Sequence, residues 1–599
     1  MAAIEPSTSE PRLLLDVLET ISTGDYAFVD GRDRVSEVPY ASLRERVGRV
    51  AAALARQGIR PGDRVGLMSS DKRELLLTFL GVVAAGAIPV PVAEAHLMAD
   101  LDAHLASCAA ILRRAGARAL VASRGLVPVV WSLRAEVEGA RVLDGGALLE
   151  DDAGDRWVEA EADAPCFLQF TSGSTAAPKG VVVTHRSLAA NAVGIMRHGL
   201  EVREGDRALA WLPLFHDMGL IGFGLAPLWA ALPVVLLPTI SFLKRPHSWM
   251  AAMSRFEATI TFAPNFAYGL AARRARVDGL DLSRVRVAGC GAEPIAAATL
   301  EAFCRAYAPA GFRAEAMMPC YGLAETTLAA TFAPRLRPLE VLHAEAEALE
   351  VSGEVRPTSA TAGARGCVSC GVPFPGHEVR VIDADGRRLD EDQVGEVVVR
   401  GPSVAGGYWD DPDASRDVFV DDGLRTGDLG FLHQGELYLL GREKELIILH
   451  GRNHHPHVFE LEAAEIDGVR RGNVVAFSRL GPGGDELVIV AELSGRPDRD
   501  PVERAEVERA LRARIKRRTG AVVKDVYLVD EGTLPKTTSG KLKRAEVKRA
   551  CGGATPRFVH PRRGPVSLGR AAIGVGRHVA RGVVGRLGHL IEAREEARE

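Results

Sequence analysis

The chain has 599 residues, and its composition, with 47% hydrophobic and 25% charged residues, excludes the low-hydrophobicity, high-charge pattern of intrinsic disorder. The 74 basic and 78 acidic residues leave a net charge of -4, so no overall positive field favours nucleic acid as a partner. Eight cysteines are too dilute for a disulfide scaffold, and the first residues lack the basic and apolar regions of an export signal. We therefore expect a cytoplasmic protein with reduced thiols.

The first half of the chain has the pattern of an α/β protein. From residue 40 to about 300, apolar runs such as 81–92 alternate with amphipathic segments such as 43–57. This alternation predicts βα units and a largely parallel sheet. The longest apolar stretch, 223–238, is interrupted by prolines and is too short to cross a bilayer, so we interpret it as buried core.

The second half changes character twice. Residues 371–440 carry short β-type runs separated by Gly and Asp, which predicts a small β subdomain. Apolar and charged segments then alternate again, with strand-like runs at 487–493 and 523–529 and a charged helix at 501–518. We therefore predict an α/β protein with a large N-terminal domain at 1–441, a smaller α+β C-terminal domain at 442–550 and a tail at 551–599.

The most informative segment is FLQFTSGSTAAPKG at residues 167–180. Small residues let backbone N–H groups approach phosphate oxygens, while hydroxyls and Lys179 add hydrogen bonds and charge. It is not a Walker A loop, because Pro178 occupies the place of the second glycine. A solvated loop is the ordinary interpretation of such residues, but the Pro-Lys-Gly ending favours polyphosphate binding. The candidate phosphate-binding residues are Thr171, Ser172, Gly173, Ser174, Thr175 and Lys179.

This loop resembles the TSGSTxxPKG hallmark of the adenylate-forming superfamily, which includes acyl-CoA synthetases, nonribosomal-peptide adenylation domains and luciferases. Further family motifs follow in the family's order: GAEP at 291–294, YGLAETT at 321–327, TGDLG at 426–430, GREKELIILHGRN at 441–453 and LPKTTSGKLKR at 534–544. The resemblance spans roughly residues 10–550. It implies ATP and Mg²⁺ as substrate and cofactor, and it implies that the C-terminal domain is a mobile lid.

The resemblance also assigns roles to the charged residues of these motifs. A carboxylate that attacks the α-phosphate of ATP needs its charge and that of pyrophosphate neutralised, and Lys541 is the expected cation rather than a solvated surface lysine. Glu325 is the expected Mg²⁺ ligand, because magnesium prefers one or two carboxylates plus phosphate oxygens. Thr326 beside it is expected to contact a phosphate.

The nucleotide itself is assigned to a second group of residues. Asp428 is suited to accept hydrogen bonds from both ribose hydroxyls, with a simple turn residue as the alternative, and Arg442 is the second nucleotide contact. The adenine wall and its flank are assigned to Gly291, Ala292, Glu293, Tyr321 and Gly322.

Two further positions carry expectations. His216, in WLPLFHDMGLIGFGL at 211–225, lies at a break between apolar runs. We expect it to line the passage between an acyl pocket and the α-phosphate, with a structural histidine as the alternative. Lys444 falls at the family's hinge between the large domain and the lid, where an exposed residue can change φ and ψ without unpacking a core.

Within the superfamily, the chain is most similar to fatty acyl-AMP ligases, which pass acyl groups to carrier proteins. PLFHDMGLIG at 213–222, APNFAYGL at 263–270 and GRNHHPHVFE at 451–460 carry this resemblance, with the long gap between Tyr321 and Gly371. We interpret residues from about 340 to 366 as a family insertion that restrains the lid from its CoA-using pose, against a neutral surface loop. The implied substrates are a fatty acid, ATP and an acyl carrier protein in trans. A CoA ligase and a non-catalytic nucleotide or lipid sensor are the alternatives.

The tail at 551–599 is the one strongly basic region. Seven arginines occur between Gly553 and Ile591 without an acidic residue, and apolar residues fall on one side of a helical projection. Such a pattern predicts docking on an anionic membrane surface or on an acidic carrier protein. Glycines in the tail disfavour a helix, so a solvated extension is the alternative.

Overall fold

The computed structural model describes residues 11–94, 101–131, 133, 137, 139–152, 154–171, 178–361, 363–449, 451–481, 484–495, 500–537 and 541–552. The basic tail beyond residue 552 lies outside the described residues, so its predicted docking role stays a prediction. All eight cysteines fall within the described ranges and are free thiols. Among the described helices, none has both the length and the hydropathy to cross a bilayer.

A nine-stranded sheet forms the centre of the N-terminal part, with the order β17-β14-β13-β12-β11-β9-β10-β1-β2. The strands from β13 to β1 run parallel, and antiparallel strands close both edges. Parallel strands covered on both faces are apolar throughout, as in β12, whose residues are all buried. The bounds are β1 (Asp25–Val29), β2 (Val35–Pro39), β9 (Ala208–Ala210), β10 (Val234–Leu236), β11 (Ile260–Ala263), β12 (Val287–Cys290), β13 (Met317–Tyr321), β14 (Thr331–Phe332) and β17 (Val372–Pro373).

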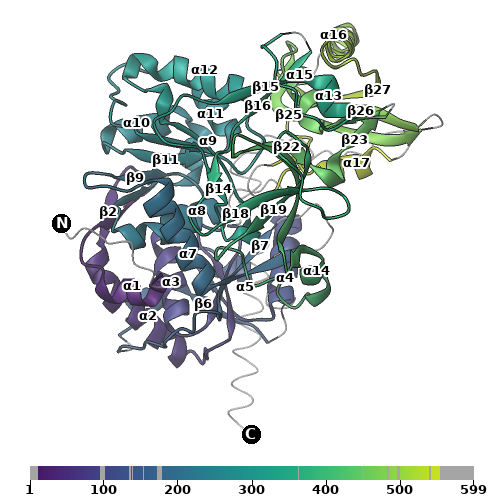
Figure 1. Ribbon diagram of the computed structural model, residues 1–599. Helices are drawn as coiled ribbons and strands as arrows, with labels where there is room; N and C mark the ends of the chain where they lie inside the picture. Colours follow the sequence, from purple (N-terminus) through teal and green to yellow (C-terminus); the bar gives the residue numbers. More distant parts are fainter. Residues whose placement is uncertain are drawn as a thin grey trace.

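A second parallel sheet has the order β4-β3-β5-β6 and lies with the first helices (Figure 1). Its strands are β3 (Arg64–Met68), β4 (Ile88–Pro91), β5 (Ala117–Ala122) and β6 (Arg141–Asp144). The amphipathic segment predicted at 43–57 forms α2 (Leu43–Arg56), which buries one face. The apolar run at 81–92 divides between α3 (Lys72–Ala84) and β4, because α3 is buried on nearly every side and therefore has no polar face to reveal its helical period.

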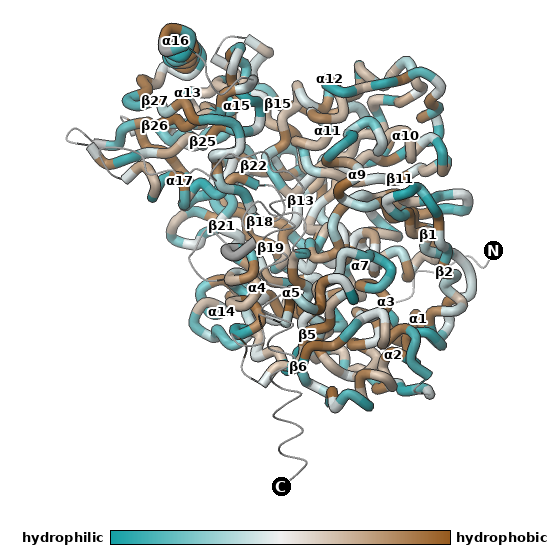
Figure 2. Tube along the Cα trace, turned by 180° about the vertical axis from the view of Figure 1, so that it is seen from behind, coloured by the Kyte–Doolittle hydropathy of each residue, from teal (hydrophilic) through white to brown (hydrophobic). Residues whose placement is uncertain are grey.

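The other helices of this part cover the faces of the two sheets. Figure 2 shows hydrophobic segments gathered inside, around β5 and β6, and hydrophilic ones along outer loops. The bounds are α1 (Leu14–Thr20), α4 (Leu101–Ala115), α5 (Val127–Trp131), α6 (Gly145–Glu150), α7 (His185–Val193), α8 (Asp217–Gly219), α9 (Thr239–Lys244), α10 (His247–Arg255), α11 (Asn265–Arg273) and α12 (Ala297–Tyr307). Both parallel sheets and their helices confirm the predicted α/β class.

The segment predicted as a β subdomain forms an antiparallel five-stranded sheet. Its elements are β18 (Glu378–Ile382), β19 (Gly395–Arg400), α14 (Pro412–Val418), β20 (Phe419–Val420), β21 (Gly423–His433) and β22 (Glu436–Arg442). Gln434 and Gly435 both have positive φ, as a two-residue hairpin between right-twisted strands requires. The last strand continues to Arg442, so the domain boundary at residue 441 stays a prediction.

The predicted insertion folds as a strand, helix and strand: β15 (Val341–Glu345), α13 (Ala346–Val351) and β16 (Ala364–Val368). It is not a free surface loop. Leu349 and Val355 share a buried apolar cluster with Phe431 and Tyr438 of the antiparallel sheet. The insertion is therefore anchored to the β subdomain by hydrophobic packing.

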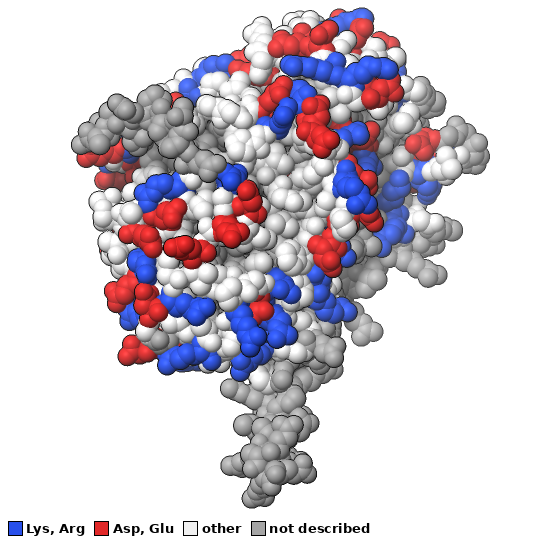
Figure 3. Space-filling view, turned by 60° about the horizontal axis from the view of Figure 1, so that its bottom comes forward, with Lys and Arg blue, Asp and Glu red and all other residues white. Residues whose placement is uncertain are grey.

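The C-terminal part has its own hydrophobic core and gathers at one corner of the molecule (Figure 1). The predicted charged helix forms α16 (Pro501–Thr519), which Asp500 caps and which ends at Gly520 with φ +74°. The other elements are β23 (Ile447–Leu449), β24 (Arg452–His454), α15 (Pro456–Ala464), β25 (Val469–Gly481), β26 (Gly484–Leu493), β27 (Val523–Val529) and α17 (Arg544–Ala550). Charges of both signs intermingle on the face in Figure 3, as on an ordinary solvated surface.

Candidate active site

The motif loops meet because four neighbouring strands of the central sheet run in the same direction. β9, β11, β12 and β13 are adjacent and parallel, so their carboxyl ends lie at one edge of the sheet. The segment with His216 follows β9, Gly291 follows β12, and Tyr321 ends β13. Ligands of open α/β sheets bind at such an edge. Segments far apart in the sequence thus form one site.

The phosphate-loop motif lies on a hairpin of β7 (Pro165–Thr171) and β8 (Lys179–Thr184), in which Thr171 and Lys179 face each other. Ser172, Gly173, Ser174 and Thr175 lie outside the described residues, and their phosphate contacts stay predictions. The ammonium of Lys179 lies 4.5 Å from the ring centroid of Tyr408. This cation–π contact holds the lysine without neutralising its charge.

The turn that follows β13 positions Glu325. A Cβ atom at Gly322 would lie 1.8 Å from the carbonyl oxygen of Leu328, so the turn admits only glycine there. Thr327 has φ +67° and ψ -60°, and the Leu328 N–H bonds the Thr326 carbonyl at 2.8 Å. This is the rare γ-turn with positive φ, a strained backbone that persists only where its surroundings enforce it.

The side chains of Thr326 and Glu325 differ in whether they are free to bind a ligand. The Thr326 side chain is 1% exposed, and its hydroxyl donates to the Leu323 carbonyl at 2.9 Å. A phosphate contact, as predicted for Thr326, requires this bond to break. The Oε1 atom of Glu325 instead accepts a hydrogen bond from the Tyr408 hydroxyl at 2.8 Å.

The donor set fits magnesium bound jointly with a polyphosphate. Among the described residues, no group of three or more Asp, Glu, His or Cys side chains could form a complete protein cage for a metal ion. A single carboxylate such as Glu325, held by a neutral hydroxyl, suits Mg²⁺ that takes its remaining ligands from phosphate oxygens and water. Glu325 is therefore the residue that would hold it.

Asp428, Tyr321 and Arg442 form one polar cluster. Tyr321 Oη donates to Asp428 Oδ2 at 2.6 Å, and Arg442 Nε lies 3.0 Å from Asp428 Oδ1. Asp428 on β21 is the direct register partner of Arg442 on β22. Burial raises the pKa of Asp428, and Arg442, the Tyr321 hydroxyl and Lys541 oppose that rise. Sequence analysis assigned these residues separately to ribose and adenine and did not predict their mutual contacts.

The GAEP loop at 291–294, for which an adenine-binding role is predicted, is held against β13 and α11. A Cβ at Gly291 would lie 2.7 Å from Cys320 Sγ, and Ala292 has φ +69°. Glu293 Oε1 accepts from the Phe266 N–H at 2.6 Å, which ties the loop to the start of α11. Burial raises the pKa of Glu293, while that N–H and two lid lysines act in the opposite direction.

Lys541 of the lid reaches the site. Its charge acts on Asp217, Glu293 and Asp428, lowering the pKa of each carboxyl relative to burial alone. The Lys541 N–H donates to Thr537 Oγ1 at 3.0 Å, and its carbonyl accepts from the Thr537 N–H at 2.7 Å. These two bonds join Lys541 to Thr537. The charge of Lys541, in the C-terminal part, therefore acts on acidic residues of the large N-terminal part, whereas its predicted role at the α-phosphate stays a prediction.

Arg544, which follows Lys541 closely in the chain, makes two ion pairs that the motifs did not predict. Arg544 pairs with Glu445, next to the predicted hinge residue Lys444, and with Glu460 at 2.8 Å. Lys444 is exposed on a short helical turn between β22 and β23. Arg544 thus ties the segment after Lys541 to Glu445 and Glu460, which both follow Lys444 in the chain, whereas the hinge role of Lys444 itself stays a prediction.

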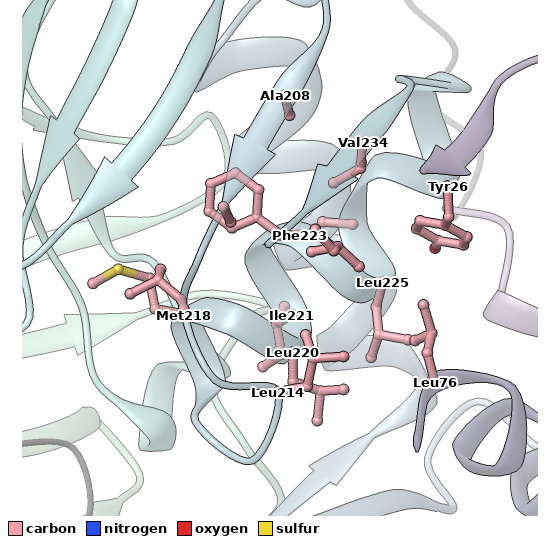
Figure 4. Close-up of a cluster of buried hydrophobic side chains, with 14 of the residues drawn as sticks. Tyr26, Leu76, Ala208, Leu214, Met218, Leu220, Ile221, Phe223, Leu225 and Val234 are labelled. Atoms are coloured by element: carbon pink, nitrogen blue, oxygen red, sulfur yellow. The ribbon is translucent and has the colours of Figure 1, made fainter. Parts of the chain in front are cut away.

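His216 and Asp217 lie at the entrance of an apolar segment. His216 Nδ1 contacts Asp217 Oδ1, and His216 and Lys541 hold the pKa of Asp217 below its ordinary value although burial raises it. The chain continues as a π-helix at 220–225, a form common at functional sites. Figure 4 shows the side chains that follow, Met218, Leu220, Ile221, Phe223 and Leu225, which belong with Leu76 and Tyr26 to one buried hydrophobic cluster.

Comparison with known proteins agrees with this geometry. The family described as AMP-binding enzyme matches residues 22–409. The chain belongs to this family. A Caulobacter vibrioides protein provisionally named an acyl-CoA synthetase is 39% identical over 90% of this chain and 94% of its own. The medium-chain-fatty-acid–[acyl-carrier-protein] ligase of Moorena producens is 32% identical over 87% and 91%.

A solved structure from work on fatty acyl-adenylate ligases of E. coli and L. pneumophila is 32% identical, with a TM-score of 0.85 over 90% of this chain and 97% of that one. Membership in the adenylate-forming enzymes, which use ATP, is therefore confirmed, as is the fold of a large N-terminal part followed by a smaller C-terminal one. The names of the relatives differ in the acceptor of the acyl group.

Proposed function

We propose that this chain activates a fatty acid with ATP to form an acyl-adenylate and pyrophosphate, and then transfers the acyl group to the thiol of an acyl carrier protein. The observation that carries the proposal is the position of Lys541. Its charge acts on Asp428 at the nucleotide end of the site and on Asp217 at the start of the apolar segment. Because one charge acts on both carboxyls, we infer that Lys541 is near the point where a fatty carboxylate would meet the α-phosphate.

This arrangement supports a simple reaction. A carboxylate oxygen of the fatty acid attacks the α-phosphorus, a new O–P bond forms, and the bond from the α-phosphorus to the bridging oxygen of pyrophosphate breaks. Lys541 stabilises the charge that develops on the α-phosphate, and the Tyr321–Asp428–Arg442 cluster positions the nucleotide. Mg²⁺ held by Glu325 would supply charge neutralisation on the departing phosphates. In the transfer step the carrier sulfur forms a bond to the acyl carbon, the bond from that carbon to the phosphate oxygen breaks, and AMP and the thiol proton are released.

The apolar segment after Asp217 supports a fatty acid rather than a polar acid as substrate. Its side chains are buried and hydrocarbon in character, and the Tyr26 hydroxyl fixes the π-helix by donating to the Gly224 carbonyl at 2.6 Å. An acyl tail placed along this segment would meet hydrocarbon and would leave no polar groups unpaired. The fatty-acid activities of similar proteins agree with this assignment.

Contacts between the insertion and the lid support a carrier protein rather than CoA as the acceptor. Arg452 of β24 pairs with Glu347 at 2.9 Å, and buried His454 lies 3.1 Å from Glu350. Arg365 contacts His457 Nε2 at 3.0 Å. Burial and Arg365 hold the pKa of His457 well below its ordinary value, so the neutral ring accepts this bond. These contacts support the proposal that the insertion restrains the lid.

Deleting residues 340–364 is expected to leave adenylation intact but to raise acyl-CoA formation roughly tenfold. The deletion removes Glu347 and Glu350, and a loss of about 1.4 kcal/mol from one lid pose shifts its population tenfold. Acyl-CoA is measured by mass spectrometry after incubation with ATP, fatty acid and CoA. The double variant Glu347→Gln/Glu350→Gln keeps the segment and its packing, and a smaller increase is expected. Equal acyl-CoA from all three proteins would refute the restraint.

The acceptor itself is tested by competition. The purified chain is given ATP, a fatty acid, CoA and a phosphopantetheinylated carrier protein together, and both thioesters are quantified. The proposal predicts acyl-carrier protein in excess of acyl-CoA. Predominant acyl-CoA identifies a CoA ligase, and the absence of any adenylate identifies the non-catalytic alternative.

For the tail we propose a docking role that is separate from catalysis. Truncation after Gly553 removes the seven clustered arginines and is expected to weaken sedimentation with anionic vesicles or association with the carrier. Acyl-AMP formation should not change, because the site lies in residues before the tail. If the truncated and full-length proteins bound vesicles equally and loaded the carrier at the same rate, the docking role would be wrong.

A further inference from the structure

One aromatic side chain connects the two groups that must bind the same triphosphate. Tyr408 donates its hydroxyl to Glu325 Oε1 at 2.8 Å, and its ring faces the ammonium of Lys179 at 4.5 Å. Lys179 belongs to the phosphate hairpin and Glu325 to the turn after β13, so the two residues come from different parts of the site. None of the motifs used in sequence analysis includes Tyr408.

The backbone of residues 405–409 and the ring of Tyr408 are both fixed by contacts with neighbouring segments. The Gly406 N–H donates to the Val182 carbonyl and the Trp409 N–H to the Gly180 carbonyl, which binds the tyrosine's loop to β8. The Ala405 N–H donates to the carbonyl of Glu325 itself at 2.9 Å. The Tyr408 N–H donates to Ser415 Oγ, and its ring packs edge-on against Phe419 with centroids 5.3 Å apart. A side chain so fixed can impose its geometry on flexible neighbours.

This arrangement leaves the Lys179 ammonium free to bind phosphate and the Glu325 carboxylate free to bind a metal ion. Had Lys179 and Glu325 paired with each other, phosphate and metal binding would each first have to break an ion pair. Within the described part of the chain, no carboxylate lies within ion-pair distance of Lys179. A neutral hydroxyl on Oε1 leaves Oε2 as a ligand, and an aromatic ring orients an ammonium without cancelling its charge.

We propose that Tyr408 is a positioning residue that separates Lys179 from Glu325 and holds both in their ligand-binding orientations before ATP arrives. The inference rests on the proposed roles of Lys179 at phosphate and Glu325 at the metal. The two halves of the tyrosine serve different ligands. Its hydroxyl orients Glu325 for the divalent cation, and its ring orients Lys179 for the phosphates.

Two substitutions separate these halves. Tyr408→Phe keeps the ring and removes the hydroxyl, so the apparent affinity for Mn²⁺ in the presence of a non-hydrolysable ATP analogue should fall about tenfold. Binding of that analogue without metal should stay near the parent value. Tyr408→Leu removes both contacts, and metal-free analogue binding should also fall, by about fivefold. Mn²⁺ binding is measured by electron paramagnetic resonance and analogue binding by calorimetry.

Controls exclude a general effect of losing a buried hydroxyl. Tyr307→Phe removes a buried hydroxyl that donates to the Ala271 carbonyl, away from the site, and should change neither affinity. In a Glu325→Gln background, Tyr408→Phe should have no additional effect on Mn²⁺, because the group it orients is gone. Parent-like Mn²⁺ affinity of Tyr408→Phe, or effects that add in the double variant, overturns the inference alone. Parent-like Mn²⁺ affinity of Glu325→Gln overturns the proposed metal ligand.

Discussion

Lys541→Ala is expected to lower the rate of acyl-adenylate formation at least about 100-fold while leaving ATP binding nearly unchanged. In the proposed mechanism the charge of Lys541, which acts on Asp217 and Asp428, stabilises the developing charge on the α-phosphate, and losing one such donor costs about 3 kcal/mol. The ion pair of Asp428 and Arg442, to which we assign nucleotide binding, is not altered by this substitution. Pyrophosphate release measures the chemical step, and calorimetry measures ATP binding.

A matched control exists two residues away. Lys543 pairs with Glu546 at 3.4 Å on the same segment. Unlike Lys541, it is not among the groups that shift the pKa of Asp217, Glu293 or Asp428. Lys543→Ala should therefore release pyrophosphate at close to the parent rate. Near-normal pyrophosphate release from Lys541→Ala would remove Lys541 from the mechanism.

Asp428→Asn is expected to weaken ATP binding by about 2–3 kcal/mol, or about 30- to 150-fold in kcat/KM for ATP. The amide keeps the shape of the side chain but loses the charge that balances Arg442. Its oxygen can still accept hydrogen bonds, whereas its nitrogen can only donate them. If Asp428 accepts from the ribose, the variant should also lose the parent's preference for ATP over 2′-deoxy-ATP.

Tyr321→Phe separates this role from the integrity of the cluster. It removes the 2.6 Å hydrogen bond to Asp428 Oδ2 but keeps the carboxylate and the ring. A smaller loss of ATP affinity with an unchanged preference for the ribose hydroxyl is expected. Equal behaviour of Asp428→Asn and the parent towards ATP and 2′-deoxy-ATP would show that Asp428 only shapes the turn.

Much of the fold could be predicted because its elements have strong local patterns. The helix α16 carries its Asp500 cap and Gly520 stop in the sequence, and the parallel strands read as apolar runs. Helix α3 could not be recognised in the same way. It is buried on nearly all sides, so part of it merged with β4 into one apolar run.

The site could be predicted only where a motif carried it. Lys541 and Asp428 occur in motifs, but that the charge of one acts on the other could not be predicted, because the two residues are far apart along the chain. Tyr408 and Arg544 act through contacts between segments, which leave no periodic signal in the sequence. The GGYW run at 406–409, in which Gly406 lets the loop approach β8, is the one local feature that could have indicated Tyr408.

The central claim is that the chain makes an acyl-adenylate from a fatty acid and ATP. The most direct measurement is mass spectrometry of the purified chain after incubation with ATP, Mg²⁺ and a mixed fatty-acid pool, without CoA or carrier protein. The account predicts fatty acyl-AMP and pyrophosphate in equal amounts, and neither above background with Lys541→Ala. Parent enzyme that releases no pyrophosphate and forms no acyl-AMP from any fatty acid in the pool would contradict it.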